Sequence, residues 1–370
     1  MSWIPVILIL PYLIILLKIY RSLLYSTTYY LSSDPSTFIS VVVACRNEQD
    51  NLPSLLNSIA LQDYPGKLFE VIIVNDWSTD NSIKIAERYT GISNLITLNN
   101  KGNGKKLALR TGIAIARGEL IISTDADCKM GKNWIRTIAA FYELNKPDLI
   151  ICPVRTEPVR GMFGKFQELE FLSLQGVTAG SALLNNASMC NGANLAFTKK
   201  VYLDHSDDLH DEINSGDDVF LLHSIKKEDR SKVLWLESPD SLVITKPSPT
   251  LWSFIKQRSR WLSKGRAYKD RFTIVLGGVT FIAIILQAAY FFALIFHPYL
   301  IWCFLTILVL KSVPDFLILY NTSVRYKREE LMKWFIPTQI IYPFYVLCVA
   351  FYSLISKEIR IINSPSQKGT

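Results

Sequence analysis

Two carboxylates stand one residue apart after an apolar stretch in residues 119–130, which read ELIISTDADCKM. Leu120 to Ile122 have the composition of a buried strand, and Asp125 and Asp127 follow them. One helix cap needs only one acid, so capping does not account for both. Carboxylates at this spacing suit a hard divalent cation whose other ligands are diphosphate oxygens. Such a cation would offset the charge on a departing diphosphate, which predicts metal-assisted transfer chemistry.

Polar clusters also follow two earlier apolar stretches. The first stretch ends in ACRNE (residues 44–48) and the second in NDWSTD (residues 75–80). Parallel strands bring their carboxyl ends to one edge of a sheet, where ligands bind in α/β folds. We therefore expect these clusters and the two acids of TDADC to meet in one crevice. Asp80 is a separate case, because a single acid before a helix is equally well explained as an N-cap.

The elements that must position these clusters alternate between strand and helix patterns. Buried, β-branched runs predict strands at residues 38–45, 69–75, 94–98, 119–125 and 148–154. Apolar residues at helical spacing predict helices at residues 50–62, 80–90, 105–118 and 131–144. This alternation is typical of an α/β domain with a mostly parallel sheet and helices on both faces.

Apolar blocks at both ends of the 370-residue chain indicate a membrane protein. One is N-terminal and three are C-terminal, and each approaches or exceeds the roughly 20 residues that cross a bilayer. They cover residues 3–25, 274–296, 299–320 and 334–356. No small-residue cleavage site follows the first block, so we expect it to remain as an anchor. The chain is thus expected to divide into an anchor (1–25), a globular domain (26–265) and a C-terminal transmembrane region (266–370).

Charged residues near these blocks predict how the chain meets the membrane. Residues 162–184 and the basic, tryptophan-containing segment QRSRW (257–261) are expected to form interfacial helices. Lys311 and Asp315 stand one helical turn apart inside the third block, so they are expected to neutralise each other. The net charge of +8 is concentrated beside the blocks, which favours lipid headgroups over nucleic acid as partners.

Basic residues also predict orientation. Lys18 and Arg21 close the first block and place that end, with the globular domain after it, on the cytoplasmic side. Four crossings would place the C-terminal tail outside, whereas its own basic residues favour the inside, so its side stays open. These residues are Lys357, Arg360 and Lys368. The six cysteines show no C-x-x-C spacing, which predicts a reducing compartment and no zinc site.

The strand-end clusters resemble the family 2 glycosyltransferases with the GT-A fold, a Rossmann-like α/β fold. The segments are SVVVACRNEQDNLPSLLNSIALQDYP, VIIVNDWSTDNS and GKKLALRTGIAIARGELIISTDADC. Further on, CNGANLAFTKK, SGDDVFLL and QRSRW resemble the membrane-bound branch of that family. That branch includes cellulose, hyaluronan, chitin and poly-N-acetylglucosamine synthases and ceramide glucosyltransferase.

The resemblance implies roles for ten residues, position by position. On the donor side it implies nucleotide-sugar contacts at Glu48, Asp76, Lys105, Asp125, Gln257 and Arg260, and a metal ligand at Asp127. On the acceptor side it implies contacts at Trp261 and Asn194 and a general base at Asp218. Two positions depart from the family pattern, both near the expected base pocket. Trp77 stands where a glycine is usual, and Arg46 stands where an aromatic residue is frequent.

The chemistry requires such a set of residues. The acceptor hydroxyl must lose its proton as it attacks, which a nearby carboxylate can accept. The departing diphosphate must be stabilised, which a metal with Arg or Lys can do. A single displacement of this kind inverts the anomeric centre. The alternative for Asp218 is an N-cap beside Asp217, because this stretch leads into a helix.

We therefore predict an inverting glycosyltransferase that depends on Mg²⁺ or Mn²⁺ and sits in the cytoplasmic (inner) membrane with its catalytic domain facing the cytoplasm. The expected donor is a nucleotide sugar, UDP-linked by resemblance, and the expected acceptor is a lipid or lipid-linked glycan. QRSRW favours a second reading, a processive polysaccharide synthase, whereas four apparent spans favour the lipid. A non-catalytic membrane scaffold that keeps the nucleotide fold is the third reading.

Overall fold

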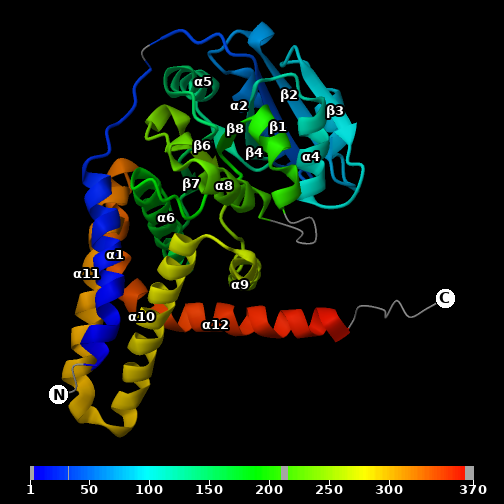
Figure 1. Cartoon of the computed structure of the whole chain (residues 1–370). Coiled ribbons are helices and arrows are strands. Elements are labelled where there is room, and N and C mark those ends of the chain that lie inside the picture. The colour runs from blue at the N-terminus through cyan, green and yellow to red at the C-terminus, as the bar shows by residue number, and fades with distance from the viewer. Residues whose placement is uncertain (1–3, 32, 210–215, 363–370) are drawn as a thin grey trace.

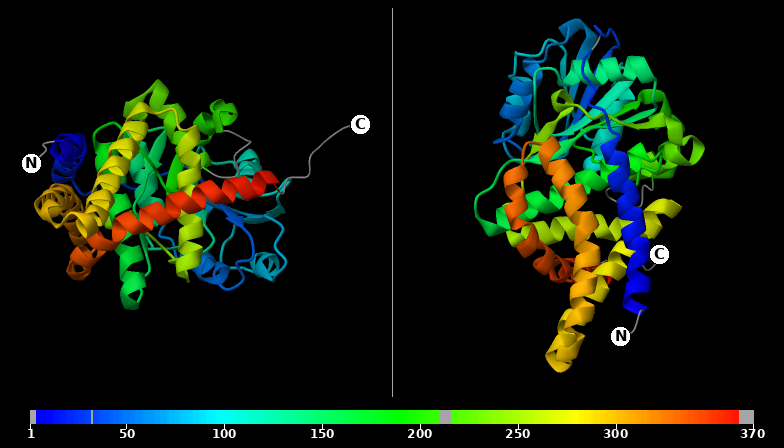
Figure 2. Two further views of the ribbon diagram at one scale, coloured as in Figure 1. Left: turned by 90° about the horizontal axis from the view of Figure 1, so that it is seen from below. Right: turned by 90° about the vertical axis from the view of Figure 1, so that its left-hand side faces the viewer.

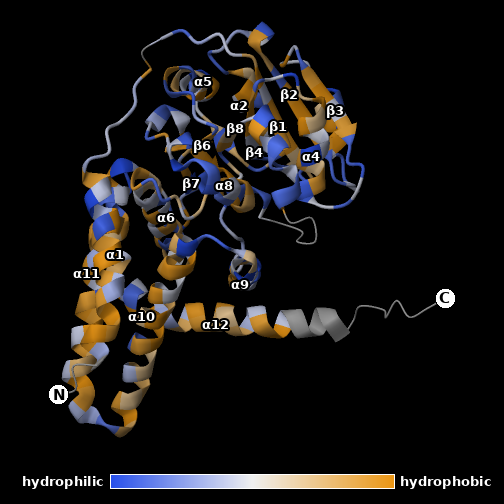
Figure 3. Cartoon of the chain, viewed as in Figure 1, coloured by the Kyte–Doolittle hydropathy of each residue, from blue (hydrophilic) through white to orange (hydrophobic). Residues whose placement is uncertain are grey.

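The computed structural model describes residues 4–31, 33–209 and 216–362. An α/β body forms one part of the molecule, and long apolar helices extend from it on one side (Figure 1). In the hydropathy colouring these long helices are mainly orange, whereas the surface of the body is mixed (Figure 3).

A seven-stranded sheet forms the centre of the body. Its order is β3–β2–β1–β4–β8–β6–β9, and the pairs β1–β2, β2–β3, β1–β4 and β6–β9 are parallel. Its strands are β1 (Ile39–Cys45), β2 (Phe69–Asn75), β3 (Leu95–Asn99), β4 (Leu120–Asp125), β6 (Leu149–Ile151), β8 (Leu195–Thr198) and β9 (Val233–Trp235). Helices flank it: α2 (Leu52–Ala60), α3 (Ser82–Glu87), α4 (Lys105–Ile115), α5 (Trp134–Asn145), α7 (Lys199–Asp204) and α8 (Asp217–Glu228). The predicted α/β class with a mostly parallel sheet is confirmed.

Strand register brings the polar clusters together. Ala44 pairs with Asp125 across β1 and β4, and Cys45 pairs with Asn75 across β1 and β2. Val41, Val42 and Val43 of β1 are fully buried, because helices cover both faces of the sheet. The loops that leave these three strands therefore begin side by side, as the sequence predicts.

One predicted strand is divided in two. Residues 148–154 contribute β6 to the large sheet and the start of β7 (Val154–Thr156) to a second sheet, which also contains β5 (Lys129–Met130) and β10 (Val243–Thr245). Pro153 lies at the break, where it can donate no hydrogen bond to a ladder. Its carbonyl accepts from Val243 N and from Asn194 Nδ2, so the chain turns from one sheet to the other there.

Within the part of the chain that the structure describes, four helices are long and apolar enough to cross a membrane by length and composition, one N-terminal and three C-terminal. They are α1 (Ile4–Leu24), α10 (Arg271–Phe296), α11 (Ile301–Arg325) and α12 (Phe335–Ile362). Helices α1, α10 and α11 lie alongside one another and point away from the body, whereas α12 runs across them (Figures 1 and 2). Lys311 Nζ lies 2.8 Å from Asp315 Oδ2 within α11, as their spacing predicts.

Helix α6 (Gly161–Leu183) joins the body to the long helices. A Cβ at Gly180 would lie 2.6 Å from Ile19 Cγ2 and 2.8 Å from Ile19 O, so α1 packs directly on the backbone of α6. A Cβ at Gly176 would lie 2.6 Å from Ile318 Cγ2 of α11. Small residues one helical turn apart permit such close approach between helices. Helices α1 and α11 therefore pack on the GVTAG segment (residues 176–180) of α6.

A buried ion pair joins α6 to α9 (Leu251–Lys264). Arg258 Nε donates to Glu170 Oε1 at 2.8 Å and its second terminal nitrogen donates to Oε2 at 2.6 Å. The two side chains are only 8% and 5% exposed. The Tyr345 hydroxyl of α12 also donates to Glu170, at 3.2 Å, and its ring stacks on Phe254 of α9. Three helices thus meet at one carboxylate.

Adding one methyl group at Gly180 should destabilise the protein. We expect Gly180→Ala to cost about 1–3 kcal/mol through overpacking against Ile19. Thermal unfolding of the detergent-purified protein measures the change. Gly278→Ala on α10 is the control, because nothing lies within 4 Å of a Cβ there and alanine favours helix. Equal unfolding temperatures for the two variants would contradict the close packing of α6 on α1.

Removing the charge of Glu170 should also destabilise the protein. Glu170→Gln leaves the Arg258 guanidinium buried without a counter-charge, which costs about 3–5 kcal/mol. Denaturant unfolding of the purified protein measures this loss. Asp204→Asn is the matched control, because its pair with Lys200 is exposed and should contribute nothing measurable. If both variants unfold like the unchanged protein, the pair does not hold α9 on α6.

Candidate active site

A polar pocket of about 100 Å³ lies beyond the carboxyl end of β4. Its wall comes from the β4 end, α6, the loop around residue 192, the segment that follows β10, and α9. The polar and charged lining residues are Asp125, Asp127, Thr156, Gln167, Asn191, Thr245, Lys246, Ser248, Gln257 and Arg258, with Trp261 and Phe171 beside them. Asp125, Asp127, Gln257 and Trp261, which the resemblance places in one site from distant segments, share this pocket.

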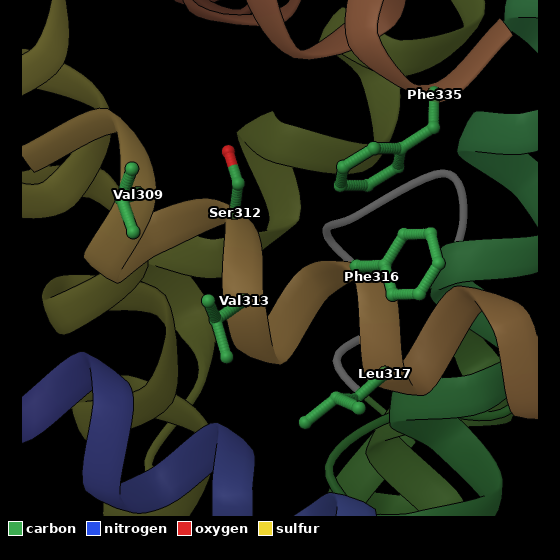
Figure 4. A pocket seen from close by; sticks show the side chains of 6 residues that line it. All are labelled: Val309, Ser312, Val313, Phe316, Leu317 and Phe335. Atoms are coloured by element: carbon green, nitrogen blue, oxygen red, sulfur yellow. The ribbon is translucent and has the colours of Figure 1, made fainter. Parts of the chain in front are cut away.

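A second, apolar pocket lies elsewhere. It has a volume of about 280 Å³ and faces outward between α11 and the first residue of α12 (Figure 4). Its lining residues are Val309, Ser312, Val313, Phe316, Leu317 and Phe335. Because no titratable group lines it, this pocket offers no acid, base or ion to a reaction. The polar pocket is therefore the candidate site.

Carboxylates crowd the floor of the polar pocket. Burial raises the pKa of Asp127, and the Asp125 charge raises it further. Thr245 Oγ1 donates to Asp127 Oδ2 at 3.1 Å, which partly offsets this. Burial also raises the pKa of Glu48, with contributions from the charges of Asp127 and Asp125, although Asn51 donates to it at 2.5 Å. Three acids share one negative region, which a cation would stabilise.

Two lysines reach this region from separate elements. Lys105, the first residue of α4, donates to Asp125. Lys246, which follows β10 and lines the pocket, donates to Asn51. Neither is held by a buried partner, so both remain able to meet an anionic ligand. Lys105 therefore lies where the resemblance implies, beside the acids.

Asp76 organises the loop that leads into α4. It is 4% exposed, and its Oδ1 accepts from Asn100 Nδ2 and from Gly104 N, both at 2.8 Å. Gly104 has a φ of 97°, which favours glycine at this turn. The other carboxylate oxygen of Asp76, Oδ2, lies 3.6 Å from Arg46 Nη1. The carboxylate thus fixes the loop that presents Lys105.

Trp77 adopts a left-handed backbone conformation, with a φ of 59°, at the position where the family pattern has glycine. Its indole nitrogen donates to Gly102 O at 2.7 Å, and the side chain is 58% exposed. The departure from the pattern is therefore accommodated by the same loop that Asp76 holds.

Asp218 lies in the first turn of α8, after Gly216 with a φ of 102°. Its Oδ2 accepts from Gly192 N at 3.1 Å, and residues 191 and 193 on either side line the pocket. Its other oxygen accepts from Val219 N of its own turn at 2.9 Å. Asp217 beside it has a pKa raised by burial and by the Asp218 charge. Residues 210–215, in the polar stretch before α8, lie outside the described residues.

The QRSRW segment presents one face to the pocket. Gln257, Arg258 and Trp261 line it, and the Arg258 guanidinium lies 4.1 Å from the Trp261 ring centre and 4.5 Å from that of Phe254. Burial alone would lower the pKa of Arg258, but the Glu170 carboxylate raises it, so the side chain stays charged. Arg260, which the resemblance assigned to the diphosphate, is exposed and outside this wall.

Asn194 is also outside the pocket. It is fully buried, and its Oδ1 accepts from Trp134 Nε1 at 2.9 Å. Its Nδ2 donates to the carbonyls of Pro153 and Ser241, each at 2.7 Å. With these groups occupied, Asn194 ties α5 to the break between the two sheets. The structure gives it no path to an acceptor.

Sequence reasoning missed Arg258, Glu170, Thr245 and Lys246. Arg258 could have been found, because positions 254, 257, 258 and 261 share one helical face. Thr245 ends the short strand Val243–Thr245 and Lys246 follows it. Polar residues at the end of an apolar strand are the signal that marked the other clusters. Glu170 carried no signal, because nothing in the sequence pairs it with α9.

Among the described residues no group of three or more His, Cys, Asp or Glu side chains could hold a metal alone. The donor set nevertheless fits a cation that is shared with a diphosphate, because such ions keep waters and phosphate oxygens and need one or two carboxylates. Asp127, whose pKa is raised by burial and Asp125, would gain a counter-charge. The residues present therefore fit Mg²⁺ or Mn²⁺.

Two curated proteins are similar to part of this chain. Poly-beta-1,6-N-acetyl-D-glucosamine synthase of Staphylococcus epidermidis is 28% identical over 240 residues, 61% of this chain and 54% of that protein. Undecaprenyl-phosphate 4-deoxy-4-formamido-L-arabinose transferase of Edwardsiella ictaluri is 38% identical over 94 residues, 24% of this chain and 29% of that protein. The chain thus spans about half or less of the length of these relatives.

A solved structure has the same fold over nearly the whole chain. It is the mannosyltransferase PcManGT from Pyrobaculum calidifontis in complex with GDP-Man and Mn²⁺. The TM-score is 0.58 at 17% identity, covering 96% of this chain and 97% of that one. The family model for Glycosyl transferase family 2 matches residues 40–205, which contain β1 to β4 and the acids. Those residues form a glycosyltransferase family 2 domain with a GT-A-like fold.

Proposed function

We propose that this protein transfers a sugar from a nucleotide sugar to an acceptor at the membrane, with inversion at the anomeric carbon. The observation that carries the proposal is the single pocket that holds Asp125, Asp127, Gln257, Arg258 and Trp261. Acids for a diphosphate-bound cation and an arginine–tryptophan wall for phosphate and sugar meet there. The family 2 glycosyltransferase domain supports the same activity.

The donor diphosphate belongs among the acids and cations of the pocket. Asp127 and Asp125 would hold Mg²⁺ or Mn²⁺, which supplies positive charge to the departing diphosphate oxygens. Lys105 and Lys246 reach the same region, and Arg258 stays charged against its wall. Glu48 and the loop that Asp76 fixes would bind the nucleoside, which we expect to be uridine.

Asp218 is the proposed general base. The acceptor oxygen attacks the anomeric carbon as its proton passes to the Asp218 carboxylate, and the bond to the diphosphate breaks with the electron pair leaving on the nucleoside diphosphate. Asp218 Oδ1 accepts from Val219 N of its own turn at 2.9 Å, and a carboxylate oxygen has a further lone pair for a hydroxyl. Its place beside the loop that lines the pocket supports this role.

The proposed acceptor is a lipid or lipid-linked glycan in the inner membrane, reached from the cytoplasmic face. The pocket wall on α9 packs on α12, an apolar helix with exposed hydrophobic side chains, so the acceptor side of the pocket adjoins lipid. The Edwardsiella relative is named for transfer to undecaprenyl phosphate. The Staphylococcus relative is named for a polymer, which keeps a processive polysaccharide synthase as the alternative.

Purified membranes that contain the protein, supplied with a panel of radiolabelled nucleotide sugars, test the proposed function. Label in one discrete organic-soluble product supports the lipid acceptor, and a ladder or smear on a gel supports the polymer. Nucleotide binding without any transfer supports a non-catalytic scaffold and overturns the proposal.

Turnover should require the divalent cation. We expect excess EDTA to abolish transfer, Mg²⁺ or Mn²⁺ to restore it, and Asp127→Asn to remove nearly all of it, because the cation stabilises the leaving group. Asp204→Asn, an exposed acid on α7, is the control and should leave transfer unchanged. Full activity in excess EDTA would falsify the metal assignment.

Variants of the proposed base and of the proposed acceptor contact should lose sugar transfer without losing binding of the nucleoside diphosphate. Asp218→Asn cannot accept the proton, so transfer should slow by roughly 10²–10⁴-fold while nucleoside diphosphate binding survives. Trp261→Ala should raise the KM for the acceptor and leave diphosphate binding in place. Titration of the nucleoside diphosphate, beside transfer rates, measures both effects. If Asp218→Asn loses nucleotide binding as completely as Asp127→Asn does, Asp218 belongs to the donor site instead.

A further inference from the structure

Helix α12 is apolar enough to cross a membrane, but its direction differs from that of the other long helices. Helices α1, α10 and α11 run alongside one another, and the hairpin between α10 and α11 lies at the end far from the catalytic body (Figure 1). Helix α12 runs across this group beneath α9, and the views from below and from the side show the same crossing (Figure 2). If α1, α10 and α11 cross a membrane, α12 therefore runs along the plane of that membrane and does not cross it.

A buried polar network fixes the first half of α12 in this direction. Gln339 Nε2 donates to Asp315 Oδ2 at 3.0 Å, and Gln339 Oε1 accepts from Lys311 Nζ at 2.9 Å. Gln287 of α10 donates to the Gln339 carbonyl at 3.0 Å. Lys311 is 1% exposed, so the loss of these partners would leave a buried charge less well satisfied. Gln339 therefore ties α12 to both α10 and α11 at the crossing point.

The second half of α12 lies along the catalytic body. Tyr345 stacks on Phe254 of α9 with ring centres 5.3 Å apart, and its hydroxyl donates to Glu170 of α6. About two turns further on, Tyr352 packs edge-on against Trp252 of α9, with ring centres 4.8 Å apart. A helix held along its length by a domain on one side of the membrane cannot also reach the other side.

The opposite face of α12 is apolar and exposed. Its exposed large hydrophobic residues are Ile336, Ile340, Ile341, Phe351, Leu354 and Ile355. At 3.6 residues per turn these positions fall on one side of the helix, away from Gln339 and Tyr345. A helix with one packed face and one exposed apolar face is suited to lie in the membrane interface.

We propose that α12 lies along the membrane surface on the side of the catalytic domain, with its apolar face in the lipid, and that α1, α10 and α11 alone cross. The C-terminus is then on the same side as the catalytic domain. The basic residues of the tail in the sequence, Lys357, Arg360 and Lys368, then accord with the side that Lys18 and Arg21 indicate. Helix α9, which lines the pocket with Gln257, Arg258 and Trp261, then packs on a helix that lies in the membrane interface.

Sealed membrane vesicles that carry the full-length chain test this topology. One version has an epitope tag after Thr370, and a matched version has the same tag between His297 and Pro298 in the α10–α11 hairpin. An impermeant protease is added to inside-out and to right-side-out vesicles. We expect the C-terminal tag and the catalytic domain to be cut in the same preparation, and the hairpin tag to be cut only in the other.

If α12 also crosses the membrane, as a fourth span, the C-terminal tag lies on the same side as the hairpin tag. A C-terminal tag that is cut together with the hairpin tag, or that is cut in both preparations, overturns the in-plane placement of α12. The readout is cleavage rather than sugar transfer, so its failure is independent of the proposed activity. Equal elution volumes of the tagged and untagged proteins in size-exclusion chromatography confirm that the tag leaves the protein folded.

Discussion

The position of α9 depends on one buried contact, the pair between Arg258 and Glu170. Taking both charges out of water is costly, and two short hydrogen bonds, two aromatic rings and the Tyr345 hydroxyl offset that cost. The pair fixes α9 against α6, and the glycines of α6 fix that helix against α1 and α11. The wall of the pocket is therefore continuous, through packed side chains, with the apolar helices α1 and α11.

Electrostatic crowding is the second constraint on the site. Parallel register sets the ends of β1, β2 and β4 side by side, so their polar loops cannot avoid one another. Burial and mutual repulsion raise the pKa values of Glu48 and Asp127, and lysines from α4 and the β10 end partly balance this charge. A cation and a diphosphate bound as proposed would relieve this repulsion, which would link ligand binding to the stability of the site.

The membrane helices contribute to this site as well as anchoring it. Helix α12 seals the far side of the Arg258–Glu170 pair and presents an apolar face outward. Helix α9 therefore stands between the pocket and α12: one face of α9 lines the pocket and Phe254 stacks on Tyr345 of α12. If α12 lies in lipid as proposed, an acceptor held in the membrane would approach the pocket from this side.

The sequence by itself determined the α/β class, the strand order along the chain and the meeting of Asp125 and Asp127 with the other strand-end clusters, because strand patterns and helical periodicity are local signals. The place of QRSRW beside the acids came from the resemblance to a known family. It also marked four apolar helices. Only the tertiary structure decided which arginine faces the pocket, since helix α9 turns Arg258 inward and Arg260 outward. It likewise buried Asn194 and set α12 across its neighbours. Those outcomes depend on contacts between segments far apart in the chain, such as Glu170 with Arg258 and Gln339 with Asp315, which no local pattern encodes.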